Sequence, residues 1–80
     1  MQVKDEVRQY ILKNYLFSTD ASALGDEVSL MQTGIIDSTG ILELIMFLQE
    51  KFGIEVADEE MIPENLDSVE KIVAFVARKS

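Results

Sequence analysis

The sequence has no cysteine, no histidine and only one proline among its 80 residues. Without cysteine the chain can form no disulfide, and without cysteine and histidine it lacks the ligands of a usual zinc site. It also lacks a cysteine nucleophile and the histidine that most often activates a serine. The abundant carboxylates are expected to form a solvated acidic surface, because so short a domain offers little pocket in which to desolvate a catalytic acid or base. We therefore expect a protein that is not an enzyme.

Basic residues are scarce: seven Lys and Arg stand against 15 Asp and Glu, and the formal net charge is -8. Such a surface repels nucleic acids and anionic membranes and favours basic partners. The acidic cluster Asp58 to Glu60 lacks the spacing of an EF-hand, so we expect no bound metal. The chain does not open like a signal peptide, and its longest apolar-rich stretch, Ile41 to Leu48, is too short to span a bilayer. We expect a cytoplasmic monomer that does not insert into membranes.

Apolar residues recur at helical spacing in three segments, and no segment has the alternating pattern of a strand. The three predicted helices run to about Leu16, from Ser38 or Thr39 to Gly53, and onward from the N-cap candidates Asp67 and Ser68. Their apolar stripes are Val3, Val7, Tyr10 and Ile11, then Ile41, Leu44, Ile45, Leu48 and Phe52, and finally Val69, Ile72, Val73 and Val76.

A long loop, Ser18 to Thr33, separates the first two helices, and loops of this length usually signal function or disorder. Its apolar residues argue against disorder because they can pin the loop to the core; they are Leu24, Val28, Leu30 and Met31. The acidic segment Val56 to Ile62 is closed by Pro63 and suits a single turn or a brief helix. Residues 1–80 are thus predicted to form one all-α domain, a small three-to-four-helix bundle with a long first loop.

The run Gly34-Ile35-Ile36-Asp37-Ser38 lies between the long loop and the most apolar helix. Together with Glu43-Leu44 and Glu50-Lys51-Phe52, it resembles the phosphopantetheine attachment region of acyl carrier proteins. An isolated Asp-Ser pair carries no information, but the resemblance extends over nearly the whole chain. It includes the long loop, the acidic segment and the closing helix from Ser68.

This resemblance implies the acyl carrier protein fold and a 4'-phosphopantetheine group attached covalently to Ser38. The thiol of that group would carry acyl intermediates as thioesters to enzymes of fatty acid, lipid or polyketide-type biosynthesis. The implied partners are a phosphopantetheinyl transferase of the holo-acyl-carrier-protein synthase type, an acyl or aminoacyl ligase, and synthases and transferases with basic docking patches. Asp37 is implied to help position the Mg²⁺ of the transferase during loading.

The residues by themselves leave two roles open for Ser38. Serine is a preferred N-cap residue, so Ser38 can simply cap the second helix. Asp37 can also be the cap, which would leave the Ser38 hydroxyl free for modification. A helix N-terminus suits an attached phosphodiester, because its free N–H groups and the positive end of the helix dipole stabilise an anion. With the resemblance added, we predict attachment at Ser38.

Leu42 and Met46 lie off the apolar stripe of the second helix, and Glu43 and Glu50 stand seven positions apart on one flank. An apolar spot framed by carboxylates suits a basic partner with a hydrophobic depression, and methionine adapts to several partners. Alternatively, Leu42 and Met46 fill the core as part of a wide apolar face. Because this helix resembles the family's partner-recognition helix, we predict that these four residues bind partners.

Thr39 and Gly40 depart from the family pattern, which has an apolar residue, usually leucine, followed by an acidic one. Glycine in the first turn of a helix costs roughly 0.5–1 kcal/mol relative to alanine, which points to a steric reason or to simple tolerance. The departure is compatible with a specialised pathway in which the cargo is an amino acid. Two alternatives therefore stand beside the acyl carrier: an aminoacyl or peptidyl carrier loaded by an adenylating ligase, and an unmodified acidic helical adaptor.

Overall fold

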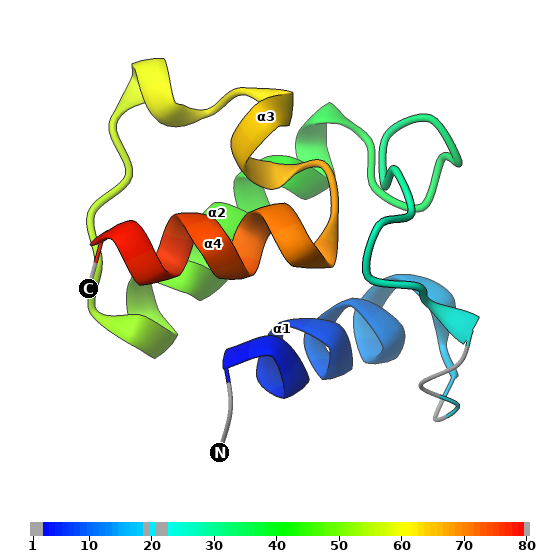
Figure 1. Ribbon diagram of the computed structural model, residues 1–80. Helices are drawn as coiled ribbons and strands as arrows, with labels where there is room; N and C mark the ends of the chain where they lie inside the picture. The colour runs from blue at the N-terminus through cyan, green and yellow to red at the C-terminus, as the bar shows by residue number, and fades with distance from the viewer. Residues whose placement is uncertain (1–2, 19, 21–22, 80) are drawn as a thin grey trace.

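The structure is a computed structural model, and it describes residues 3–18, 20 and 23–79. Its elements are α1 (Val3–Ile11), the π-helical turn η1 (Leu12–Leu16), α2 (Ser38–Phe52), the 3₁₀ turn η3 (Asp58–Glu60), α3 (Pro63–Leu66) and α4 (Val69–Lys79). Figure 1 shows the long loop between η1 and α2 at one side of the three main helices, with the short α3 above the start of α4. No strand occurs among the described residues, and the predicted helical bundle with a long first loop is confirmed.

The first predicted helix is confirmed, but it changes geometry along its length. The α-helical part ends at Ile11, and the chain continues as the wider turn η1 to Leu16. Phe17 closes this turn in the left-handed conformation, at φ 51°, with its N–H bonded to the carbonyl oxygen of Leu12. A π-helical turn contains an extra residue relative to an α-helical one. It therefore changes the direction in which a residue of η1, such as Tyr15, faces.

The second and fourth helices also begin and end close to their predicted positions. Gly53 follows α2 in the left-handed conformation, at φ 66°, which glycine adopts readily because it has no Cβ. At the start of α4, Ser68 is the cap, because its Oγ accepts a hydrogen bond of 3.1 Å from the N–H of Lys71. Asp67, the other candidate, binds the long loop instead, through its own carbonyl oxygen and carboxylate.

Asp67 holds the long loop against the bundle. The N–H of Leu30 donates to the Asp67 carbonyl oxygen at 2.7 Å, and the N–H of Met31 donates to Asp67 Oδ1 at 3.0 Å. Leu24 and Leu30 are buried and Val28 packs against the core, as predicted. The prediction that Met31 also pins the loop is wrong: its side chain is 43% exposed, because Leu30 takes the inward position in this turn.

The acidic segment contains the predicted single turn, η3, but Pro63 does not close it. Pro63 is instead the first residue of α3, a helix that the sequence analysis did not anticipate. Proline is well suited to this position, since the N–H that it lacks has no acceptor in the first turn and its φ already fits a helix.

The hydrophobic core draws on all the helices and on the long loop, and α4 packs against both α1 and α3. No helix among the described residues combines the length and apolar character needed to cross a membrane. The buried apolar side chains are Val7, Ile11, Leu12, Leu24, Leu30, Ile36, Leu44, Ile45, Leu48, Ile54, Val56, Leu66, Val69, Ile72, Phe75 and Val76.

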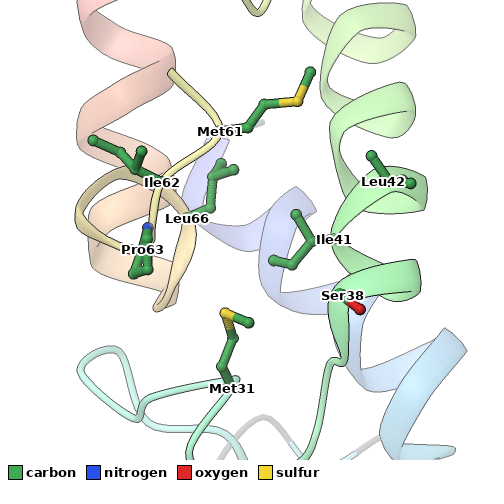
Figure 2. A pocket seen from close by; sticks show the side chains of 8 residues that line it. All are labelled: Met31, Ser38, Ile41, Leu42, Met61, Ile62, Pro63 and Leu66. Atoms are coloured by element: carbon green, nitrogen blue, oxygen red, sulfur yellow. The ribbon is translucent and has the colours of Figure 1, made fainter. Parts of the chain in front are cut away.

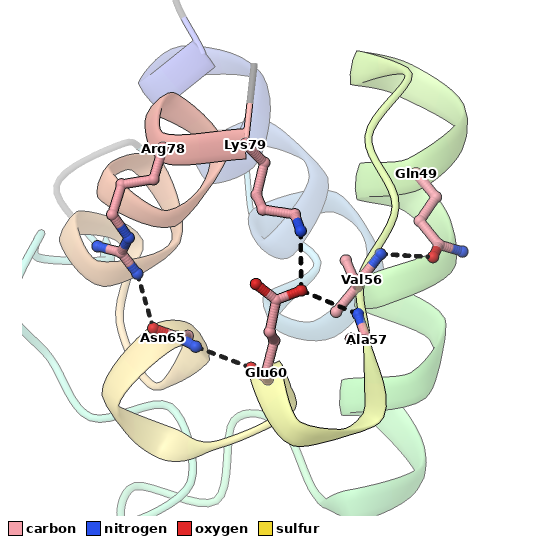
Figure 3. A network of polar contacts seen from close by, with 7 residues as sticks. All are labelled: Gln49, Val56, Ala57, Glu60, Asn65, Arg78 and Lys79. Carbon is pink, nitrogen blue, oxygen red and sulfur yellow. Dashed lines mark hydrogen bonds and ion pairs between the residues drawn. The ribbon is translucent and has the colours of Figure 1, made fainter.

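A polar network fixes the segment between α2 and α4 (Figure 3). Glu60 Oε1 accepts hydrogen bonds from the N–H of Ala57 at 3.0 Å and from Lys79 Nζ at 2.9 Å. Asn65 Nδ2 donates to the Glu60 carbonyl oxygen at 2.9 Å, and Asn65 Oδ1 accepts from Arg78 Nη2 at 2.8 Å. η3 and α3 are thereby tied to the end of α4.

We expect replacement of Glu60 by glutamine to remove an acid-sensitive part of the stability. The hydrogen bond from Ala57 and the charge of Lys79 lower the pKa of the Glu60 carboxyl from its ordinary value near 4.5. A depressed native pKa adds stability above the unfolded-state pKa, and that stability is lost as the pH falls through the native value. The melting temperature of Glu60→Gln should therefore be lower than that of the wild type at about pH 7, and the two should converge in acid as the pH falls through the native pKa of Glu60. A difference in melting temperature that persists unchanged in acid would contradict this role.

Candidate functional site

The site lies at the start of α2, where Asp37 rather than Ser38 is the N-cap. Asp37 has extended backbone angles, and its Oδ1 accepts a hydrogen bond of 2.7 Å from the N–H of Gly40. The N–H of Ile41 donates to the Asp37 carbonyl oxygen at 3.0 Å, which is the first hydrogen bond of the helix. Ser38 is therefore the first helical residue, and the alternative in which its hydroxyl caps the helix is wrong.

Ser38 is exposed, and its hydroxyl makes no hydrogen bond to any residue that the structure describes. The N–H groups of Ser38 and Thr39 precede the first intrahelical hydrogen bond, so they have no acceptor within the helix. They point toward the helix N-terminus, where the dipole favours negative charge. The position thus combines an accessible hydroxyl with an environment that favours an anionic phosphate.

An apolar cavity of about 270 Å³ opens beside Ser38 (Figure 2). Its walls come from α2, from the turn at Met31, from the residues between η3 and α3, and from α3 itself. Met31, which the sequence analysis assigned to the core, lies at the bottom of this view and faces the cavity. The lining residues are Met31, Ser38, Ile41, Leu42, Met61, Ile62, Pro63 and Leu66.

The four residues predicted to bind partners are exposed on α2. Leu42 is 56% exposed and Met46 is 59% exposed, so the alternative in which they fill the core is wrong. Glu43 and Glu50 are exposed as well. The core side of the helix is formed by other residues, Leu44, Ile45 and Leu48. We call Leu42, Glu43, Met46 and Glu50 the α2 face.

The sequence analysis missed Tyr15, which reaches the site from η1. Its hydroxyl donates to Glu43 Oε2 at 3.0 Å and lies 3.2 Å from the carbonyl oxygen of Gly40. Burial, followed by the contacts with Tyr10 and Glu43, raises the pKa of the Tyr15 hydroxyl above its ordinary value. The only signal of this contact in the sequence was the unexplained glycine at residue 40. The neighbouring residues do not indicate which distant side chain packs against that glycine.

The glycine at residue 40 has a steric cause, and this decides between the two explanations that the sequence left open, a steric reason and simple tolerance. It is buried, and a Cβ there would lie 2.9 Å from Ile36 Cγ2 and 3.2 Å from Tyr15 Cε1. Contacts this short would force one of these side chains to move.

No group of three or more His, Cys, Asp or Glu residues within the described part of the chain could hold a metal ion.

Fold and site together define a small acidic helical domain with an exposed serine hydroxyl at the first residue of α2. An acyl carrier protein of Campylobacter hominis is 34% identical over 76 residues, covering 95% of this chain and 91% of the relative. A D-alanyl carrier protein of Streptococcus suis is 36% identical over 76 residues, covering 95% and 92%, respectively. An acyl carrier protein of Helicobacter hepaticus is 37% identical over 59 residues, covering 74% and 75%. No family model matches the chain. The chain belongs to the acyl carrier protein family.

Proposed function

We propose that this protein is a discrete carrier with a 4'-phosphopantetheine group on Ser38, and that it delivers acyl intermediates to partner enzymes. The observation that carries the proposal is the exposed Ser38 hydroxyl, which does not cap α2 because Asp37 is the N-cap. When bound, the group supplies a terminal thiol that holds the cargo as a thioester. The protein itself is the carrier and not the catalyst, consistent with its family membership.

The residues around Ser38 fit such a group. The free N–H groups at the start of α2 stabilise a phosphodiester anion, and the apolar cavity beside Ser38 gives an attached arm a surface to lie against. Asp37 uses only Oδ1 for capping; its Oδ2 makes no hydrogen bond to a described residue. That oxygen is available to help position the Mg²⁺ of a transferase during loading.

The test is to incubate the purified protein with coenzyme A, Mg²⁺ and a broad-specificity phosphopantetheinyl transferase, and to measure its intact mass. The proposal requires a gain equal to one phosphopantetheine. A protein that keeps its original mass under conditions that load another carrier would contradict it and would leave the unmodified adaptor.

We further propose that the α2 face is the docking surface for partners with basic patches. Reversing one of its charges should slow the encounter of carrier and enzyme. For both Glu43→Lys and Glu50→Lys, we expect the KM of the transferase for the apo-protein to rise on the order of 10-fold with a similar kcat. Steady-state kinetics at fixed ionic strength measure this.

Glu70→Lys is the matched control, because it makes the same charge change on the exposed surface of α4. Its KM should stay within about two-fold of the wild-type value, since separated surface charges are screened by salt. Equal effects of all three substitutions would mean that net charge alone matters, which would refute a localised docking face.

A second candidate function is an aminoacyl carrier. The similarity to a D-alanyl carrier protein over 95% of the chain supports it. The two candidates share Ser38 and differ in the enzyme that loads the arm. Acylation of the holo-protein by an adenylating amino acid ligase, and not by an acyl ligase, would favour the aminoacyl carrier.

A further inference from the structure

In the first turn of α2, both backbone groups of Gly40, its N–H and its carbonyl oxygen, contact side chains. On one side, the N–H of Gly40 donates to Asp37 Oδ1 at 2.7 Å. On the other side, the Gly40 carbonyl oxygen lies 3.2 Å from the hydroxyl of Tyr15, which belongs to η1. Ser38 belongs to the same turn and lies between Asp37 and Gly40 in the sequence. η1, distant in sequence, therefore contributes to the geometry of the segment that carries Ser38.

The Tyr15 ring is packed in place from two directions. On one side the ring lies against Gly40, where an added Cβ would be only 3.2 Å from Tyr15 Cε1. On its other side it meets the Tyr10 ring edge-on, with centroids 6.1 Å apart, and Tyr10 stacks on Phe47 at 4.1 Å. The wide turn η1 brings Tyr15 to this position. The hydroxyl of Tyr15 is thus presented to α2 from a rigid support.

The same hydroxyl reaches one carboxylate of the α2 face. It donates to Glu43 Oε2 at 3.0 Å, and because burial and its neighbours raise the pKa of Tyr15, it keeps its proton at neutral pH. A hydrogen bond to an ionised carboxylate is stronger than one to a neutral carbonyl, so Glu43 is the main acceptor. Glu50 makes no hydrogen bond or ion pair with any described residue. One carboxylate of the α2 face is therefore held and the other is free.

We propose that Tyr15 is a positioning residue that fixes the orientation of the Glu43 carboxylate, five positions after Ser38, as the anchor for a cationic side chain of the enzymes that act on Ser38. The inference rests on the proposed function. Orienting a side chain before binding removes part of the entropy cost of forming the complex. The carboxylate keeps a second oxygen, Oε1, for the partner.

The test uses Tyr15→Phe, which removes the hydroxyl and keeps the ring. With the transferase and apo-protein, KM should rise about 3- to 10-fold, the effect of one hydrogen bond, with kcat unchanged within about two-fold. Glu43→Gln should raise KM by a similar factor. Because both variants break the same arrangement, the double variant should have no higher KM than the more affected single one.

Glu50→Gln provides the matched comparison, since this carboxylate has no contact with Tyr15. Its effect on KM should multiply with that of Tyr15→Phe. The inference is overturned if Tyr15→Phe leaves KM unchanged, if it lowers kcat instead, or if its effect also multiplies with that of Glu43→Gln. A wild-type protein that gains no mass would instead refute the proposed function, so the two failures are distinguishable.

Discussion

The Ser38→Ala variant is expected to keep its unmodified mass after incubation with coenzyme A, Mg²⁺ and a phosphopantetheinyl transferase, whereas the wild type gains one phosphopantetheine. The physical reason is the loss of the hydroxyl oxygen to which, in our proposal, the phosphate is joined, so the expected effect is complete. The fold should be unaffected, because the Ser38 hydroxyl makes no hydrogen bond to the described residues and Asp37 still caps α2. Intact-mass spectrometry and far-ultraviolet circular dichroism measure the two outcomes.

Thr39→Ala is the matched control for this experiment. Thr39 is also exposed and carries a hydroxyl one residue further along α2. It should be loaded like the wild type, because alanine keeps the N–H group that faces the phosphate. A mass gain in Ser38→Ala, or its loss in Thr39→Ala alone, would place the attachment at a residue other than Ser38.

Replacing Phe75 by alanine should unfold most of the domain. Phe75 lies in α4 and is only 1% exposed. Removing a buried phenylalanine side chain typically costs about 3–5 kcal/mol, through lost burial and the cavity left behind. A domain of this size rarely has more than about 3–5 kcal/mol of stability in total. No disulfide is available to compensate, since the chain has no cysteine. Urea unfolding followed by circular dichroism measures the effect.

Phe17→Ala is the matched control, with the same side chain removed from a position that is 85% exposed. Its free energy of unfolding should stay within about 0.5 kcal/mol of the wild-type value, as for most surface substitutions. A loss as large as that of Phe75→Ala would mean that Phe17 is buried in solution. A stable, cooperatively folded Phe75→Ala variant would contradict the assignment of Phe75 to the core.

The elements that could be predicted are those whose signals are local. The spacing of apolar residues is repeated within each helix, and it located α1, α2 and α4. Gly53 could be recognised as the end of α2, because the left-handed conformation there favours glycine whatever the rest of the fold. The helix that begins at Pro63 was missed, because proline after an acidic segment is compatible with either the end or the start of a helix.

The sequence by itself determined that this is an all-α protein without cysteine or histidine chemistry, and it singled out Ser38 and the four residues of the α2 face. Only the tertiary structure decided that Asp37 is the cap, that Leu42 and Met46 are exposed, and that Met31 faces the cavity. It alone explained Gly40, whose neighbour Tyr15 is 25 positions away. The physical reason is the same in each case: periodicity and capping preferences act over a few residues. Exposure and side-chain contacts, by contrast, depend on which distant segments pack together.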